Sequence, residues 1–349
     1  MSTNKKTEFI RNQILQQVKN GNTNPATHIG ESFGMTRQAV NRHIKALVDE
    51  RKLISSGTTR SRVYSIGPIR DEVQSIKLDG NVAEDLVYRK YFSWVTDDLP
   101  SNVEGILFYG FTEMVNNVID HSEGRECIVN MHRDTNSVTL MVMDDGEGIF
   151  KRIARLCHLI DERQAILELS KGKLTTDPEN HSGQGIFFTS RMFDDFVIES
   201  KGLRFDHHHN QSYDYLNEKE KHDFVEELLG TWVGMRISID SSRTELEVFT
   251  EYTASEDDDY AFNKTVIPVK LAQFGQEQLV SRSQAKRLLA RIENFKHVIF
   301  DFEDVKMIGQ AFADQIFRVY RNMNPDIHIR YRNAAVDVEN MIKRAESEI

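Results

Sequence analysis

The stretch Glu113-Met-Val-Asn-Asn-Val-Ile-Asp-His121 decides how the middle of the chain folds. Glu113, Asn117 and His121 are spaced four residues apart, so in a helix their side chains lie on one face. Apolar residues such as Leu107 and Met114 occupy the other face, and the pattern predicts a helix over about residues 103–121. Polar residues at this spacing usually cover a solvated surface, so this stretch alone does not establish a site.

Two further motifs follow along the chain. A strand predicted over 138–143 leads into Asp144-Asp-Gly-Glu-Gly-Ile149, in which Gly146 and Gly148 form a tight turn. The segment Ser182-Gly-Gln-Gly-Ile-Phe-Phe-Thr189 places two glycines at the start of a predicted helix. Each motif by itself is a weak signal, because many glycine-rich turns bind nothing.

Taken together and in this order, the three motifs resemble the nucleotide site of the GHKL ATPase superfamily, which includes gyrase, histidine kinases and mismatch-repair ATPases. The turn Gly230-Thr231 before the last predicted strand of this region supplies the fourth expected element. The resemblance covers about residues 103–250. It implies a Bergerat-type α/β sandwich that binds ATP and Mg²⁺.

The resemblance also implies a role for individual residues. Glu113 would be the catalytic general base, Asn117 would present its amide oxygen to Mg²⁺, and Asp144 would accept a hydrogen bond from the adenine amino group. Glycines would let the backbone approach the ligand and free the amides at a helix N-terminus for phosphate. The remaining residues expected to bind the nucleotide are His121, Gly146, Gly148, Ile149, Lys171, Ser182, Gly183, Gln184, Gly185, Ile186 and Thr231.

Several residues of this region have a plainer alternative to a role in ligand binding. His121 could equally be a histidine near the C-terminal dipole of its helix. Lys171 and Lys173 lie in residues 150–182, a polar segment expected to form a lid, and either contact phosphate or belong to a solvated loop. The run His207-His-His209 invites a metal site, but three consecutive side chains cannot all point one way, so a solvated hairpin in a charged insertion (203–227) is the favoured interpretation.

Charge separates the N-terminal segment from the rest of the chain. The whole chain of 349 residues has a formal net charge of −10. Residues 1–70 hold 12 Lys and Arg against four Asp and Glu, which gives this segment a charge of +8. The other 279 residues therefore carry a charge of −18. A basic head on an acidic body indicates that one module meets a polyanion.

The head itself resembles a winged helix-turn-helix domain, over residues 1–67. Three helices are predicted, over 7–20, from Pro25 to Phe33, and from Arg37 to Glu50 with Thr36 as its cap, followed by a small β-hairpin. The resemblance implies binding of double-stranded DNA. The residues expected to read bases or contact phosphate are Thr36, Arg37, Gln38, Asn41, Arg42, Lys45, Arg60 and Arg62.

A second small module is predicted at the C-terminal end. After a helical connector (68–102), the ATPase-like region (103–250) and an acidic linker (251–261), the segment 262–349 alternates strands at 264–270, 297–302 and 327–331 with helices at 282–293, 310–322 and 335–346. This pattern resembles the STAS-like fold of anti-anti-sigma factors. The stretch Val305–Asp314, where that family carries a phosphorylatable serine, has no Ser or Thr. The tail is therefore expected to bind the ATPase region or another partner without being modified.

The fold class is thus multidomain α+β, and the favoured function is a bacterial transcriptional regulator switched by Mg-ATP, with slow hydrolysis and a homodimeric form. The alternative is an anti-sigma-like serine/threonine kinase or partner-switching protein. Histidine autokinase activity is disfavoured, since no histidine stands between His43 and Glu113. Two distant cysteines, the lack of an apolar run near 18 residues and the absence of a hydrophobic leader core predict a cytoplasmic protein that neither spans a membrane nor is secreted.

Overall fold

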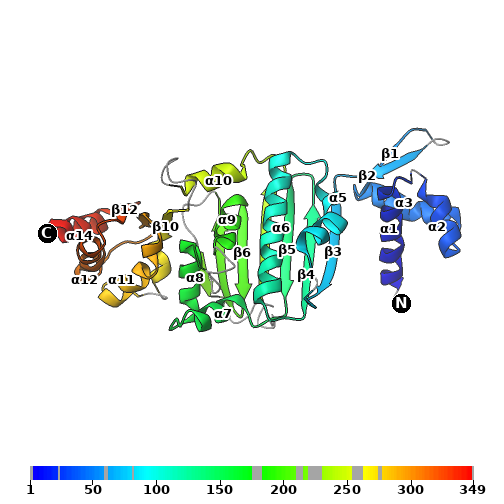
Figure 1. Ribbon diagram of the computed structural model, residues 1–349. Helices are drawn as coiled ribbons and strands as arrows, with labels where there is room; N and C mark the ends of the chain where they lie inside the picture. The colour runs from blue at the N-terminus through cyan, green and yellow to red at the C-terminus, as the bar shows by residue number, and fades with distance from the viewer. Residues whose placement is uncertain are drawn as a thin grey trace.

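The chain forms three units that follow one another in a row, with the two termini at opposite ends (Figure 1). The units belong to a computed structural model. It describes residues 3–22, 24–58, 62–80, 82–174, 183–209, 215–218, 230–253, 262–273 and 277–347.

The N-terminal unit consists of three helices and a two-stranded antiparallel hairpin. Its elements are α1 (Thr3–Lys19), α2 (Pro25–Phe33), α3 (Arg37–Asp49), β1 (Leu53–Ser56) and β2 (Val63–Ile66). Gly34, at φ +62°, ends α2, and the Thr36 Oγ1 accepts a hydrogen bond from the Ala39 N–H at 3.2 Å at the start of α3. The apolar stripes of the three helices enclose a core that is separate from the rest of the molecule. The predicted helices agree with these bounds, except that α1 begins earlier.

The central unit is built on a seven-stranded antiparallel sheet of order β3-β4-β5-β9-β6-β7-β8. The strands are β3 (Arg70–Lys77), β4 (Glu126–Arg133), β5 (Ser137–Asp144), β6 (Asp195–Ser200), β7 (Leu203–His208), β8 (Tyr215–Glu218) and β9 (Trp232–Ser238). In β4 and β5 buried residues alternate with partly exposed ones, as expected when a strand buries one face against helices.

Helices cover that buried face (Figure 1). The longest is α6 (Ser101–His121), which packs on β5 and β9 and against α9 (Gly185–Met192). The others are α4 (Glu84–Val87), a π-helical segment (Tyr88–Phe92), α5 (Ser93–Thr96), α7 (Ile149–Leu156), α8 (Glu162–Lys171) and α10 (Glu245–Glu251). The long helix predicted at 103–121 and the strands predicted around it agree with the structure.

Three sequence-based expectations for this unit need correction. Residues 70–77 are not part of a helical connector but form the edge strand β3, paired with β4 along its whole length. The polar segment after residue 156 contains a second helix, α8, whose residues from Gln164 onward are buried. The charged insertion 203–227 contains strands β7 and β8, which extend the sheet.

The C-terminal unit has a three-stranded parallel sheet of order β10-β11-β12. The strands β10 (Lys264–Pro268), β11 (His297–Asp301) and β12 (His328–Arg332) alternate with helices, as crossover connections between parallel strands require. The helices are α11 (Arg282–Leu289), α12 (Gln310–Asp314), continued by a π-helical segment (Gln315–Tyr320) and α13 (Arg321–Met323), and α14 (Val336–Ser347). The predicted order of elements is confirmed, as is a capping box between Ser281 and Gln284. The acidic stretch 256–259 lies outside the described residues.

Candidate functional site

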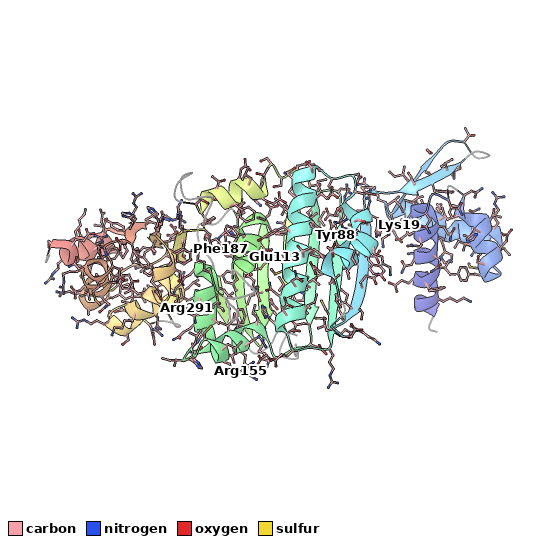
Figure 2. All side chains as sticks on the ribbon, in the orientation of Figure 1. Lys19, Tyr88, Glu113, Arg155, Phe187 and Arg291 are labelled. Atoms are coloured by element: carbon pink, nitrogen blue, oxygen red, sulfur yellow. The ribbon has the colours of Figure 1, made fainter. Side chains whose placement is uncertain are left out.

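A cavity of about 150 Å³ lies between α6, α9 and the sheet, and we call it the central cavity. Its wall brings together segments that are far apart in the sequence, since α6 and α9 are neighbours that carry Glu113 and Phe187 respectively (Figure 2). The residues predicted for the site that line it are Glu113, Asn117, His121, Asp144, Gly148, Ile149, Gly183, Gly185, Ile186 and Thr231.

Asp144 is the buried acid at the end of β5. Its Oδ1 accepts a hydrogen bond from the Gly146 N–H at 2.8 Å, and Thr231 also donates to the carboxylate. The Thr231 Oγ1 in turn accepts from the Ile149 N–H at 3.0 Å, which leaves its hydroxyl proton available to Asp144. Burial raises the pKa of Asp144 above its ordinary value, while these hydrogen bonds oppose the shift. The fold therefore holds an acceptor in a fixed orientation inside the cavity.

Glu113 is held from two sides. The hydroxyl of Tyr109, one turn earlier on α6, forms a hydrogen bond with the Glu113 carboxylate. Burial, with the negative charge of Glu113 and this hydrogen bond, raises the pKa of Tyr109 well above its usual value, so the phenol stays neutral and can donate. On the other side stands the backbone of Gly185, where a Cβ would overlap the Glu113 carboxylate.

Asn117 presents a carboxamide with unused hydrogen-bonding capacity. It lines the central cavity one turn after Glu113, and its Nδ2 is buried without a hydrogen-bond partner among the described residues. Buried polar groups are nearly always paired, so an orphaned one in a cavity wall points to a missing partner. A carboxamide oriented in this way fits a bound polar ligand or a hard cation on its oxygen.

The turn after β5 depends on glycine. Gly148 has φ +90°, a conformation that residues with a Cβ rarely adopt, and a Cβ there would also clash with the Ser200 hydroxyl. Gly146 lies in the same turn and donates to Asp144, although it is not among the lining residues. The backbone therefore approaches the cavity closely at this turn.

The predicted role of Lys171 is wrong. Its ammonium group is buried, bonds Glu168 of its own helix and reaches two backbone carbonyls of the C-terminal unit, so it does not line the central cavity. Lys173 also bonds that unit, through the Asn294 carbonyl at 2.7 Å. Gln184 precedes α9 and is not among the lining residues, and Ser182 lies outside the described part of the chain.

Two residues of the site were missed by sequence reasoning. Arg152, on the first turn of α7, lines the cavity, and its guanidinium bonds Glu123 at 2.5 Å and Glu147 at 3.4 Å. In the sequence, Arg152 could have been noticed only because it stands four residues after Gly148, in the first turn of the helix that follows the glycine turn. Tyr109 could have been found from its i−4 spacing to Glu113, which puts the two side chains on one helix face.

The N-terminal unit places its predicted binding residues as expected. Thr36, Arg37, Gln38, Asn41, Arg42 and Lys45 are all exposed, while Val40, Ile44 and Leu47 of the same helix are buried. Arg62 is exposed at the start of the hairpin's second strand, and Arg60 lies outside the described residues. One face of α3 is thus an exposed surface that carries cationic and carboxamide side chains.

The histidine run does not form a solvated hairpin. His207 is buried on β7 with its Nδ1 2.9 Å from a guanidinium nitrogen of Arg191, and His208 pairs with Asp195 at 2.7 Å. No cluster of three or more potential metal ligands occurs in the part of the chain that the structure describes.

Comparison with known proteins bears on the C-terminal unit. Residues 284–339 match the model of a family described as a STAS-like domain of unknown function (DUF4325). The predicted STAS-like domain is therefore confirmed, in a chain that is a mixed α/β multidomain protein. No curated protein matches the chain. Across the described ranges, no helix is both long and apolar enough to cross a membrane.

Proposed function

We propose that this protein is an ATP-dependent transcriptional regulator of the GHKL type, with a winged-helix DNA-binding head and a STAS-like tail. The observation that carries the proposal is the convergence of Glu113, Asn117 and Asp144 with the glycine turns on one cavity. Most of the cavity wall is apolar, yet carboxylate and carboxamide side chains from separate parts of the chain are directed into it. A nucleotide site accounts for this arrangement.

The residues present fit Mg-ATP. Asp144 would accept from the adenine amino group, since its fixed donors, Gly146 and Thr231, still leave lone pairs on the carboxylate. The oxygen of Asn117 would hold Mg²⁺, and the metal when bound would neutralise phosphate charge. The N-terminus of α9 at Gly185 would receive phosphate oxygens.

Glu113 would act as the base that orients the attacking nucleophile. A carboxylate hydrogen-bonded to a phenol beside the cavity has the chemistry for this role, and the bond to Tyr109 restricts its rotamers. The proposal assigns slow turnover to the site, so that hydrolysis resets a switch.

DNA binding is proposed for the N-terminal unit. The exposed side chains of α3 combine guanidinium groups with carboxamides, which are the groups that pair with guanine and adenine edges in the major groove. In a homodimer, two such helices would meet two half-sites, and the ATP state would alter their spacing.

The test is to incubate the full chain with Mg²⁺ and ATP labelled on the γ-phosphate, beside a Glu113→Ala variant. Free labelled phosphate from the wild type, and none from the variant, is the expected result. Label retained on the protein, or passed to a second protein from lysate, would replace the proposal with the kinase alternative. No binding and no turnover would refute a nucleotide site.

A further inference from the structure

The central and C-terminal units share one core. Their buried apolar side chains form a single continuous cluster, whereas those of the N-terminal unit form a cluster of their own. The ring of Phe262, just before β10, lies 4.8 Å from the rings of both Phe187 and Phe188 on α9. Phe187 also lines the central cavity, so this aromatic contact connects the tail directly to the cavity wall.

Lys171 forms the polar centre of this junction. It is the last residue of α8 and is 1% exposed. Its Nζ donates to the Glu168 Oε1 at 2.7 Å and to the carbonyls of Arg287 and Ala290 at 3.1 and 2.8 Å. An ammonium group has three protons, and all three are used.

Two of those acceptors belong to the end of a helix in the other unit. Arg287 lies in the last turn of α11 and Ala290 is its C-terminal cap, so their carbonyls lack intrahelical partners. A cation at this end also interacts favourably with the helix dipole. Lys171 therefore caps α11 from outside its own unit.

Further bonds tie the same few residues to the tail. The Thr265 hydroxyl on β10 donates to the Lys171 carbonyl at 2.7 Å, and Lys173 reaches the Asn294 carbonyl. Arg291 lies at this boundary in Figure 2. The backbone at 171–173 is thus anchored to the C-terminal unit through side-chain bonds on both sides.

This anchored segment is next to the cavity in sequence and in space. Leu169 and Leu174, two residues before and three after Lys171, both line the central cavity. If the tail moved away, the Lys171 ammonium would lose two carbonyl partners, its own carbonyl would lose the Thr265 hydroxyl, and Phe187 would lose its contact with Phe262. These contacts support the part of the cavity wall that contains Leu169, Leu174 and Phe187.

We propose that Lys171 is a positioning residue through which the STAS-like unit holds the wall of the central cavity, so that nucleotide affinity depends on docking of that unit. The proposal rests on the nucleotide binding proposed above. By linkage, nucleotide binding must favour the docked tail to the same degree. A protein that pulls the STAS-like unit away would expel the nucleotide.

The test uses the full chain carrying Glu168→Gln together with Lys171→Met. Changing both residues avoids leaving an unpaired buried charge, which by itself could unfold the protein. The control is Glu339→Gln with Lys343→Met, an exposed pair on α14 joined at 2.8 Å that faces neither junction nor cavity. Thr265→Val, which keeps the side-chain shape and removes only one bond to Lys171, provides a second, milder variant.

Two readouts are needed, titration with a fluorescent ATP analogue and hydrogen exchange of peptides covering 165–174. In the Lys171 variant we expect affinity to fall about tenfold and exchange protection to be lost, with no change in the control. Unchanged protection and affinity in the folded variant would overturn the proposal. If the wild type binds no nucleotide, the proposed function fails, and the exchange result alone decides whether the tail holds the wall. If the double variant does not fold, Thr265→Val decides by the same two measurements.

Discussion

Replacing Asp144 with Asn tests the central cavity most directly. The wild-type carboxylate accepts from the Gly146 N–H and from Thr231, and retains lone pairs for a ligand donor. A carboxamide has one oxygen and one NH₂ group. With fixed donors around it, the NH₂ must face either a protein donor or the adenine amino group. Asn therefore keeps the size of the side chain, but it has fewer acceptor sites for the Gly146 N–H, Thr231 and the adenine amino group.

The expected cost follows from the chemistry of that lost bond. A hydrogen bond to a charged group contributes about 1.5–3 kcal/mol, so losing the one from the adenine amino group is expected to cost about 2–3 kcal/mol. Since about 1.4 kcal/mol corresponds to a factor of ten, a loss of about 2–3 kcal/mol weakens ATP binding about 30- to 150-fold.

The assay is titration of the variant with a fluorescent ATP analogue and Mg²⁺. Asp145→Asn is a matched control, because Asp145 is the next residue, is exposed, and bonds only the backbone N–H groups of Arg125 and Glu126 among the interactions described. The control should bind as the wild type does. An Asp144→Asn variant whose affinity stays within about twofold of wild type would refute the assignment of Asp144 to adenine.

The same site predicts a pH dependence with a defined sign. Burial raises the pKa of Asp144, so on acidification this carboxylate takes up a proton at a higher pH than an ordinary aspartate. The protonated form is a weaker acceptor, and ATP affinity should fall as the pH drops through that raised pKa. The stability of the fold should not fall with it, because protonation of Asp144 removes a buried charge from the folded state in the same pH range. The Asp144→Asn variant should show no such titration of affinity over the same range.

Three further predictions concern other parts of the chain. Tyr109→Phe removes the donor to Glu113 and should lower ATP turnover about tenfold with little change in ATP affinity, which turnover and binding assays measure side by side. Gly185→Ala should abolish turnover, because its Cβ would displace the Glu113 carboxylate, while circular dichroism shows a retained fold; wild-type turnover would contradict the close approach. Arg42→Ala should strongly weaken DNA binding while leaving ATP binding intact, because this arginine is expected to read a base edge; an unchanged DNA affinity would exclude α3 as the recognition helix.

The sequence predicted a helix correctly where its apolar residues repeat at helical spacing or where a capping residue marks its start. The helix α6 was predicted because its apolar residues repeat at helical spacing, and α3 because Thr36 can cap it. The meeting of Glu113, Asn117 and Asp144 at one cavity was also expected, since a helix face and the end of a strand can each be inferred from local pattern.

It failed where tertiary packing overrode local pattern. The strand β3 lies at the edge of the sheet with its outer face exposed, so Asp71, Glu72 and Gln74 interrupt any apolar alternation. The strand β7 contains Arg204, Asp206 and His207, whose polar groups are satisfied by ion pairs and hydrogen bonds in the fold. Neither stretch has a local sequence pattern that indicates the neighbouring strand, β4 for β3 and β6 for β7, with which it pairs.

Lys171 shows the same limit for a functional residue. A lysine in a polar segment close to a glycine-rich motif is reasonably expected to face phosphate. Its actual environment depends on carbonyls more than 100 residues away, at the end of α11. Because a buried ammonium must find acceptors wherever the fold offers them, only the three-dimensional structure could assign it to the junction.

The two junctions of the central unit differ in the contacts that hold them. At the tail the units share a continuous core and a buried charge, which resist displacement. At the head the cores are separate, and a cleft of about 550 Å³ is lined by residues of both units. The Lys19 ammonium lies 4.5 Å from the centre of the Trp94 ring across this boundary, a contact that contributes about 0.5–1 kcal/mol when partly exposed. From these contacts we expect the head to reorient at smaller cost than the tail, whose displacement would remove contacts to the cavity wall.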